Sequence, residues 1–409
     1  MFDGIQAVTD LVQRTHTEAS NRWTDRAGMV APVEPLARSV NALQLAGAAV
    51  NYASIREVSR GVGVALAALT DPFLEGDDEL ATPLSGDALG TLPWWLDHAE
   101  GALNGFLGDH LARRGNSLDL GMSLRHQGKV VRPEELGTVE PNATGKVVVF
   151  VHGLSATEWS WVLYADRVWG DPATCYGTKL REDLGFTPLF VRYNTGRHVS
   201  DSGGALAQLL EDVCAHYPAE IEEIALVGHS MGGLVVRSAA HHGASSPWLR
   251  HLRHVFCLGA PHLGAPLEKG AHLLGAVLGN IPAAAASVSA AVLGARSDGI
   301  KDLRHGYTTS DEWRGEDPRA LLHDNRHDIP LVDGVGYYAL AAAFTADPQH
   351  AAGQLFGDWL VRVPSASGEA ARPERRIPFH SKRVFPGMNH LQLANHPAVY
   401  DTVRARLEG

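Results

Sequence analysis

A serine between two glycines is the residue of this sequence with the clearest chemical potential. Residues 228–232 read Gly-His-Ser-Met-Gly, and the Ser230 hydroxyl could act as a nucleophile in acyl transfer if a base accompanies it. The pattern alone is weak, because a G-x-S-x-G arises by chance in roughly a quarter of chains with this many glycines. Its meaning depends on the elements on either side.

The residues around Ser230 predict a strand, a sharp turn and a helix. The apolar run Ile224–Val227 precedes the motif, and residues 232–242 follow it with helical character. A serine on such a turn is held outwards in a strained conformation that small neighbours allow. The turn also leaves the Met231 backbone N–H at a helix N-terminus, directed at a developing oxyanion. We therefore expect Ser230 to be a nucleophile and the Met231 amide to be an oxyanion donor.

A second landmark lies upstream, where residues 147–154 read VVVFVHGL. An apolar run typical of a buried strand leads directly into His152-Gly153-Leu154. With the serine motif, this pattern resembles the α/β-hydrolase superfamily, in which a His-Gly turn supplies the second oxyanion donor. The resemblance implies that this donor is the Leu154 backbone N–H. The His152 ring is expected to hydrogen-bond its neighbours in the turn and not to transfer protons.

The C-terminal part supplies candidates for the acid of a catalytic triad. A serine nucleophile needs a histidine base and a carboxylate that orients it, and this superfamily orders them as serine, acid, histidine. Residues 357–367, GDWLVRVPSAS, are similar to the acid-bearing element of bacterial lipases, which implies Asp358 as the acid. Trp359 stands where that element usually has glycine. Asp347 and Asp333 are competing carboxylates.

The base is expected about 30 residues further on. Residues 387–391 read GMNHL and resemble the lipase element that carries the base, which implies His390. His396, just before Pro397, belongs instead to the start of the last helix. In calcium-containing secreted lipases an acidic residue stands where this chain has Gln392, so no structural calcium is expected. We expect no other metal and no cofactor.

A third match supports a narrower resemblance. Residues 256–267, FCLGAPHLGAPL, resemble the segment after the nucleophile helix in the branch of bacterial lipases and GPI inositol-deacylase-like serine esterases. The resemblance thus covers about residues 146–400.

The elements needed to position these residues follow from the pattern of apolar runs. Compact runs typical of strands buried on both faces alternate with helical patterns, which predicts an α/β fold with a mostly parallel sheet flanked by helices. A hairpin turning at Gln127-Gly128 precedes them. The expected strands are Val147–Val151, Leu189–Tyr193, Ile224–Val227, Val255–Leu258, Tyr337–Phe344 and Arg383–Phe385.

The chain divides into a helical region over residues 1–115 and an α/β-hydrolase domain over residues 116–409. Three helical segments are expected in the first region, with an acidic, turn-rich linker at residues 71–87 before the third. These helices pack on one another or on the following domain, or they contact a lipid surface.

A cap or lid insertion is expected at about residues 263–309, where ligands bind in such folds. Its stretch from Ala271 to Ala295 is uncharged and interrupted at Asn280 and Pro282. It suits either a mobile lid that presents an apolar surface to an acyl chain or a packed helical hairpin.

Composition narrows the class of protein. A net charge of −11 without a Lys and Arg cluster argues against nucleic acid as a partner. Three scattered cysteines support neither a disulfide framework nor a zinc site. No signal peptide or convincing transmembrane segment stands out, so we expect a cytoplasmic protein. The oligomeric state is not indicated.

The function that these residues favour is a serine esterase or lipase. It would hydrolyse small-molecule or lipid esters of hydrophobic acyl groups through an acyl-enzyme on Ser230. The serine argues against epoxide hydrolases and haloalkane dehalogenases, which use aspartate at this position. The alternatives are an acyltransferase or thioesterase with the same triad, or a lipid-surface scaffold protein with a vestigial site.

Overall fold

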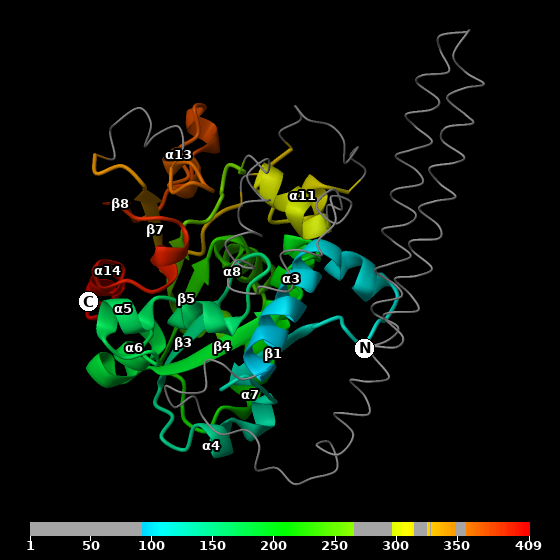
Figure 1. Cartoon of the computed structure of the whole chain (residues 1–409), viewed down its shortest axis with the longest axis vertical. Helices are drawn as coiled ribbons and strands as arrows, with labels where there is room; N and C mark the ends of the chain where they lie inside the picture. The colour runs from blue at the N-terminus through cyan, green and yellow to red at the C-terminus, as the bar shows by residue number, and fades with distance from the viewer. Residues whose placement is uncertain (1–91, 266–296, 315–324, 328, 348–356) are drawn as a thin grey trace, which may run out of the picture.

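The structure is a computed structural model that describes residues 92–265, 297–314, 325–327, 329–347 and 357–409 (Figure 1). These residues form one eight-stranded sheet with helices on both faces. Its strands are β1 (Met122–His126), β2 (Lys129–Val131), β3 (Lys146–Val151), β4 (Thr187–Tyr193), β5 (Glu223–His229), β6 (Leu252–Leu258), β7 (Gly336–Ala343) and β8 (Ser381–Pro386).

The sheet has the order β2-β1-β4-β3-β5-β6-β7-β8. Strands β3 to β8 pair in parallel, whereas β1 is antiparallel to both β2 and β4. The β1–β2 hairpin turns at Gln127 and Gly128, both with positive φ, as its sequence predicted. The predicted α/β fold with a mostly parallel sheet is therefore confirmed.

All six predicted parallel strands are present, although several begin earlier than their apolar runs. Strand β6, for example, begins at Leu252 and includes Arg253, whose side chain is exposed. Backbone pairing extends a strand through polar residues at its entry edge, where an apolar pattern gives no signal.

Helices precede, connect and follow the strands, and those from α5 to α13 lie in the connections between parallel strands. They are α3 (Leu92–Arg113), α4 (Leu136–Val139), α5 (Ala165–Trp169), α6 (Tyr176–Leu184), α7 (Val199–His216), α8 (Met231–His242), α11 (Asp298–His305), α13 (Val363–Ala366) and α14 (Pro397–Leu407). The helix predicted between the second and third parallel strands is α7, and the one predicted after the serine is α8. His396 caps α14 by accepting from the Ala398 N–H, so its predicted place at the start of the last helix is confirmed.

Alternate residues of each strand pack on opposite faces, which explains the continuous apolar runs. Val149 of β3 belongs to one core with Leu206 of α7 and Leu234 of α8. Its neighbour Phe150 belongs to the other core, with helices α6 and α14. The sheet is thus closed to water on both sides, and the carboxyl ends of its strands remain as the place for a site.

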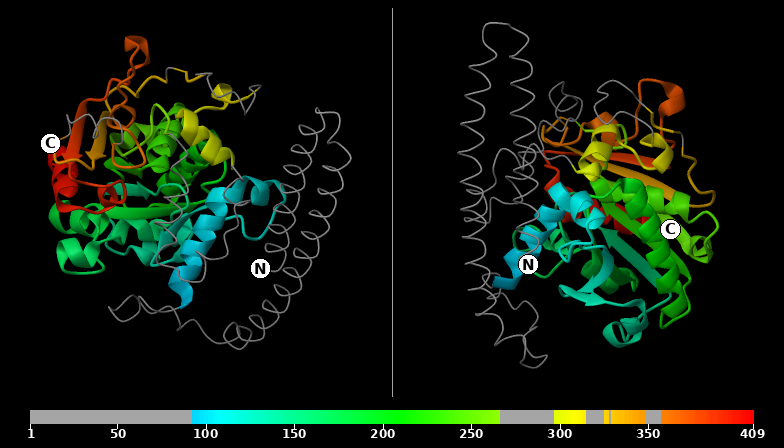
Figure 2. Two further views of the ribbon diagram at one scale, coloured as in Figure 1. Left: turned by 45° about the horizontal axis from the view of Figure 1, so that its top comes forward. Right: turned by 90° about the vertical axis from the view of Figure 1, so that its right-hand side faces the viewer.

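Helix α3 corresponds to the third helix predicted in the N-terminal region. Its residues Leu107 and Leu111 are buried, and Gly105 lies directly on Ser155, in the segment after β3. This helix therefore packs on the α/β domain. Figure 2 shows α3 and α11 on the same side of the molecule, and Ser297 at the start of α11 donates to Gly105 O at 2.6 Å.

The first two predicted N-terminal helices, the acidic linker and the stretch from Ala271 to Ala295 lie outside the described residues. Of the expected insertion at residues 263–309, the described part contains residues 263–265 and 297–309, with α11 among them. Among the helices that the structure describes, none is long and apolar enough to cross a membrane.

Candidate active site

Ser230 lies on the sharp turn between β5 and α8, as the sequence predicted. Its φ of 55° and ψ of −121° fall in a region that residues with side chains rarely adopt. The Ser230 N–H donates to Leu258 O at 2.8 Å, which ties the turn to the end of β6. A Cβ at Gly228 would collide with Gly232 O, and one at Gly232 with Val151 O. Both glycines of the motif are therefore needed for close backbone packing.

The same packing brings the His-Gly turn beside the serine. A Cβ at Gly153 would lie only 2.9 Å from the Ser230 Cβ. Within the described part of the chain, no backbone carbonyl accepts a hydrogen bond from the Leu154 or the Met231 N–H. By contrast, the Ser155 N–H donates to Thr195 Oγ1 at 3.0 Å. Two amides without backbone acceptors thus flank Ser230, one from each motif.

His152 is a structural residue of this turn. Its Nδ1 lies 3.0 Å from Gly153 O, and the Tyr193 N–H donates to its Nε2 at 3.4 Å. The His152 and Tyr193 rings stack with their centroids 4.7 Å apart. Burial lowers the pKa of His152 to about 3, so the ring is neutral, with its proton on Nδ1. The predicted role of a histidine bonded to its neighbours is confirmed.

His390 lies in the loop after β8, and its imidazole is buried. Its Nδ1 lies 2.7 Å from Asp358 Oδ2, and its backbone N–H donates to Asp358 O at 3.2 Å. A Cβ at Gly259 would lie 3.1 Å from the His390 ring, which places the ring beside the end of β6. Ser230 is bonded to Leu258 at the same strand end. The structure therefore brings the predicted nucleophile, base and acid to one edge of the sheet.

The Ser230 hydroxyl has no hydrogen bond to His390 among the contacts of the described residues. In proteins without substrate, hydrogen bonds between a nucleophile and its base are often long and close only when the substrate binds.

Asp358 is held in place by its own loop. Its Oδ1 accepts from the Leu360 N–H at 3.0 Å and the Val361 N–H at 2.8 Å, while its Oδ2 faces His390. Trp359 adopts a φ of 83°, a conformation that favours glycine, which explains why the resembling lipase element has glycine there.

The two competing carboxylates lie elsewhere. The side chains of Asp347 and Asp333 are exposed, whereas Asp358 is 1% exposed and contacts the base.

His229 is a site residue that sequence reasoning missed. It is the variable residue of the motif, and its Nε2 donates to His390 O at 3.0 Å. The two rings lie 4.8 Å apart. Burial and the neighbouring His390 lower the pKa of His229 to about 3, so His229 binds the His390 carbonyl as a neutral donor. Only its position next to Ser230 could have signalled this role.

An ion-pair network that the sequence did not reveal fixes the segment after the His-Gly turn. The Arg192 guanidinium of β4 is 1% exposed and binds Glu158 through two bonds of 2.7 and 2.6 Å. A third bond of 2.7 Å joins it to Asp97 of α3, which also accepts from the Trp159 indole at 2.8 Å. These carboxylates raise the pKa of Arg192 against the effect of burial. Helix α3 is thereby tied to the loop that follows Leu154.

No group of three or more His, Cys, Asp and Glu side chains that could hold a metal ion occurs among the residues that the structure describes. Gln392 stands where calcium-containing lipases have an acidic residue. Its Oε1 accepts from the Asn389 N–H at 2.9 Å, and its backbone N–H donates to Asn389 Oδ1 at 3.0 Å. These reciprocal bonds brace the loop that carries His390.

The sheet order, the strained serine between β5 and α8, and the buried histidine–aspartate pair define an α/β-hydrolase. Within this class, residues 142–314 match the model of the family described as "PGAP1-like alpha/beta domain", a match that covers less than half of the chain. This segment, which contains β3 to β6 and the serine, is therefore similar to that family.

Solved structures that are similar to this chain include a lipase, a phospholipase and a further bacterial protein. A mature Bacillus licheniformis lipase is 20% identical with a TM-score of 0.41, and the match covers 64% of this chain and 91% of the lipase. A Listeria innocua gene product is 14% identical with a TM-score of 0.37, over 64% and 94% of the two chains. A Legionella pneumophila phospholipase in complex with thio-NAD is 18% identical with a TM-score of 0.35, over 64% and 62%. No match was found among curated protein sequences.

Proposed function

We propose that this protein is a serine hydrolase that cleaves carboxylic esters through an acyl-enzyme on Ser230. The observation that carries the proposal is the buried contact of 2.7 Å between His390 Nδ1 and Asp358 Oδ2, beside a serine with strained backbone. A neutral imidazole that donates its Nδ1 proton to a carboxylate presents the Nε2 lone pair to a hydroxyl. His390 would thus accept the proton of Ser230 as the hydroxyl attacks the ester carbonyl.

The charge that develops on the carbonyl oxygen needs donors that are already in place. The Leu154 and Met231 amides are proposed to form this oxyanion hole, which is supported by their places in the two motifs that pack against each other. The imidazolium that forms on His390 is stabilised by Asp358 and then protonates the leaving alcohol. Water, activated by the same histidine, attacks the acyl-enzyme and releases the acid.

Esters of hydrophobic acyl groups are the proposed substrates, whether small molecules or lipids. The side chains of the two proposed oxyanion donors, leucine and methionine, are apolar and buried beside the nucleophile. Trp359, next to the acid, is 52% exposed and adds an aromatic surface close to the site. A peripheral contact with a lipid surface is compatible with such surroundings.

Hydrolysis of p-nitrophenyl esters of increasing chain length by the wild type and by Ser230→Ala tests the proposal. We expect the substitution to lower kcat by about 10⁴-fold or more, because the nucleophile and its base act as one unit. A fluorophosphonate should label the wild type and not Ser230→Ala.

Ser246→Ala is the matched control. Ser246 lies between α8 and β6, and its hydroxyl bonds Glu211, away from the carboxyl ends of the strands where the site lies. Ester hydrolysis that survives Ser230→Ala would exclude the mechanism. A panel with thioesters and added alcohol acceptors separates hydrolysis of esters from thioester hydrolysis and acyl transfer.

A further inference from the structure

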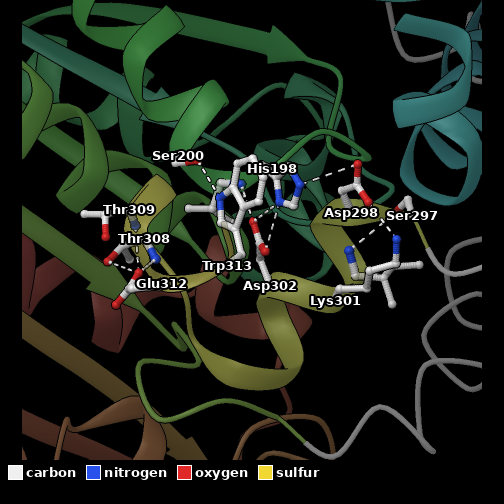
Figure 3. Close-up of polar contacts among 12 residues, drawn as sticks. His198, Ser200, Ser297, Asp298, Lys301, Asp302, Thr308, Thr309, Glu312 and Trp313 are labelled. Atoms are coloured by element: carbon white, nitrogen blue, oxygen red, sulfur yellow. Dashed lines mark hydrogen bonds and ion pairs between the residues drawn. The ribbon is translucent and has the colours of Figure 1, made fainter. Parts of the chain in front are cut away.

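A second cluster of charged side chains lies on α11, outside the proposed triad (Figure 3). His198, the residue before α7, stacks its ring on Trp313 with centroids 3.7 Å apart and planes within 2°. Its Nδ1 lies 3.0 Å from Asp302 Oδ2, and its Nε2 lies 3.5 Å from Asp298 Oδ2. Both carboxylates belong to α11, so one imidazole is held by a helix and by the indole of a following loop.

His198 and Asp302 each favour the charged form of the other. Burial opposes a charged ring, but the hydrogen bond and charge of Asp302, with the charges of Asp298 and Asp201, raise the pKa of His198. Burial also raises the pKa of the Asp302 carboxyl, to about 6, against the bonds from His198 and the Val199 N–H. The ionised carboxylate and the protonated imidazole therefore stabilise each other across this contact.

Two other carboxylates of the cluster have donors of their own. Asp298 binds Lys301 of its own helix at 2.6 Å and Arg113 of α3 at 2.8 Å. Glu312, near Trp313, accepts from the Thr308 and Thr309 N–H groups at 2.5 and 2.7 Å. Asp302 is therefore the carboxylate whose charge depends on His198, and it is only 1% exposed.

Helix α11 packs on residues that adjoin the proposed oxyanion hole. The Gly299 N–H donates to Gly196 O at 3.0 Å. A Cβ on Gly299 would collide with Thr195 O and would lie 2.9 Å from the Met231 Cε. Thr195 in turn accepts from the Ser155 N–H, the amide next to Leu154. The contacts of one glycine thus reach the neighbourhood of both proposed donors.

We propose that His198 and Asp302 are positioning residues of the oxyanion hole, which act by holding α11 on Thr195 and on the Met231 side chain. The proposal rests on the proposed function, because it concerns the same site. Without the imidazolium, Asp302 is a buried carboxylate that lacks its charged partner, and such a group is destabilising until the structure moves to hydrate it.

Movement of α11 would withdraw its support from both amide donors. A helix of eight residues has little stability of its own, so its place depends on such contacts. Oxyanion donors act mainly in the transition state, where small displacements are costly. The loss should therefore fall on kcat and leave KM nearly unchanged.

The test compares the wild type with His198→Gln and Asp302→Asn in steady-state ester hydrolysis. Rates are expressed per site titrated to completion with a fluorophosphonate, so that partial unfolding does not count as lost catalysis. Arg304→Met is the matched control, because it removes a positive charge from the same helix and, among the described contacts, the Arg304 side chain bonds neither His198 nor the carboxylates that hold it. We expect both variants to lose at least tenfold in kcat with KM within about twofold, and the control to match the wild type.

A kcat near the wild-type value in either variant, or a loss carried by KM alone, would overturn the proposal. If one variant fails to fold, the other decides, and Gly299→Ala adds an independent test because its methyl group pushes α11 off Thr195. A wild type without Ser230-dependent hydrolysis would instead refute the proposed function, and the two failures are thereby distinguished.

Discussion

Ser230 and Trp359 both have a positive φ; the first is the proposed nucleophile and the second follows the proposed acid. Their φ values of 55° and 83° are positive, although neither residue is glycine. Such strain persists only where surrounding contacts over-determine the conformation. Around Ser230 these contacts come from Gly228 and Gly232, and around Trp359 from the two amides that bind Asp358. The chain thus stores strain where the direction of a side chain matters most.

Asp358→Asn keeps the proposed base, His390, but changes the hydrogen bond that orients its ring. An amide can donate to His390 Nδ1 and so favours the tautomer whose Nε2 carries the proton, which cannot accept one from Ser230. We expect kcat to fall by roughly 10³- to 10⁴-fold while KM changes little. Steady-state hydrolysis of a p-nitrophenyl ester measures both constants.

Asp347→Asn is the natural control, because Asp347 is the competing acid and is exposed. It should behave as the wild type. The reverse result, with activity lost in Asp347→Asn and kept in Asp358→Asn, would remove Asp358 from the proposed triad.

Among the elements, β4 and α3 matter because they carry the two sides of a buried ion-pair network. Arg192 on β4 joins Asp97 on α3 to Glu158, four positions after the proposed donor Leu154. Removing one partner of a buried pair leaves the other charge uncompensated.

Glu158→Gln should therefore destabilise the fold by about 3 kcal/mol, the usual cost of breaking a buried pair on one side. Denaturant unfolding followed by tryptophan fluorescence measures this free energy. Glu135→Gln, which breaks an exposed pair with Arg132, should leave the unfolding midpoint unchanged. Equal midpoints for Glu158→Gln and the wild type would mean that the network carries no stability.

The sequence predicts the elements that have a local pattern of apolar residues or a motif. It does not predict the elements that are too short to show such a pattern. The parallel strands and α8 were predictable because buried strands are apolar throughout and the serine motif marks the turn. Helices α5 and α13 are too short to show an apolar period.

At the site, the same limit holds. Ser230, Asp358 and His390 stand in recognisable motifs, and the structure brings them to one edge. Arg192 and His198 gain their partners from residues 95 and 104 positions away, and no local pattern announces such contacts.

For the whole molecule, α11 is a junction between parts far apart in sequence. It contacts α3 through Ser297, α7 through Asp302, and Met231 of α8 through Gly299. The Ala265 N–H, in the loop after β6, donates to the Leu303 O of α11 at 3.0 Å. Stability lost at this helix should therefore be felt in the cooperative unfolding of the domain.

The pH dependence of unfolding gives a measurement of this coupling. The pKa of folded His198 lies above the ordinary value of 6.5, because Asp302, Asp298 and Asp201 outweigh the effect of burial. The raised pKa of His198 thus contributes stability that is complete below the unfolded-state pKa of about 6.5 and is lost as pH rises through the folded-state pKa. Since burial raises the pKa of Asp302 to about 6, its carboxylate is mostly ionised above about pH 6.5, where the measurement is made.

The double variant His198→Gln, Asp302→Asn lacks both titrating groups and keeps every other one. Unfolding free energies of the wild type and the double variant are measured from pH 6.5 to pH 9. The wild-type value minus the double-variant value should fall as pH rises. Subtraction of the two curves cancels the titration of the remaining groups. A difference that is flat over this range, or that grows with pH, would show that folded His198 carries no extra proton. It would leave α11 without the charge that we infer holds it beside the nucleophile.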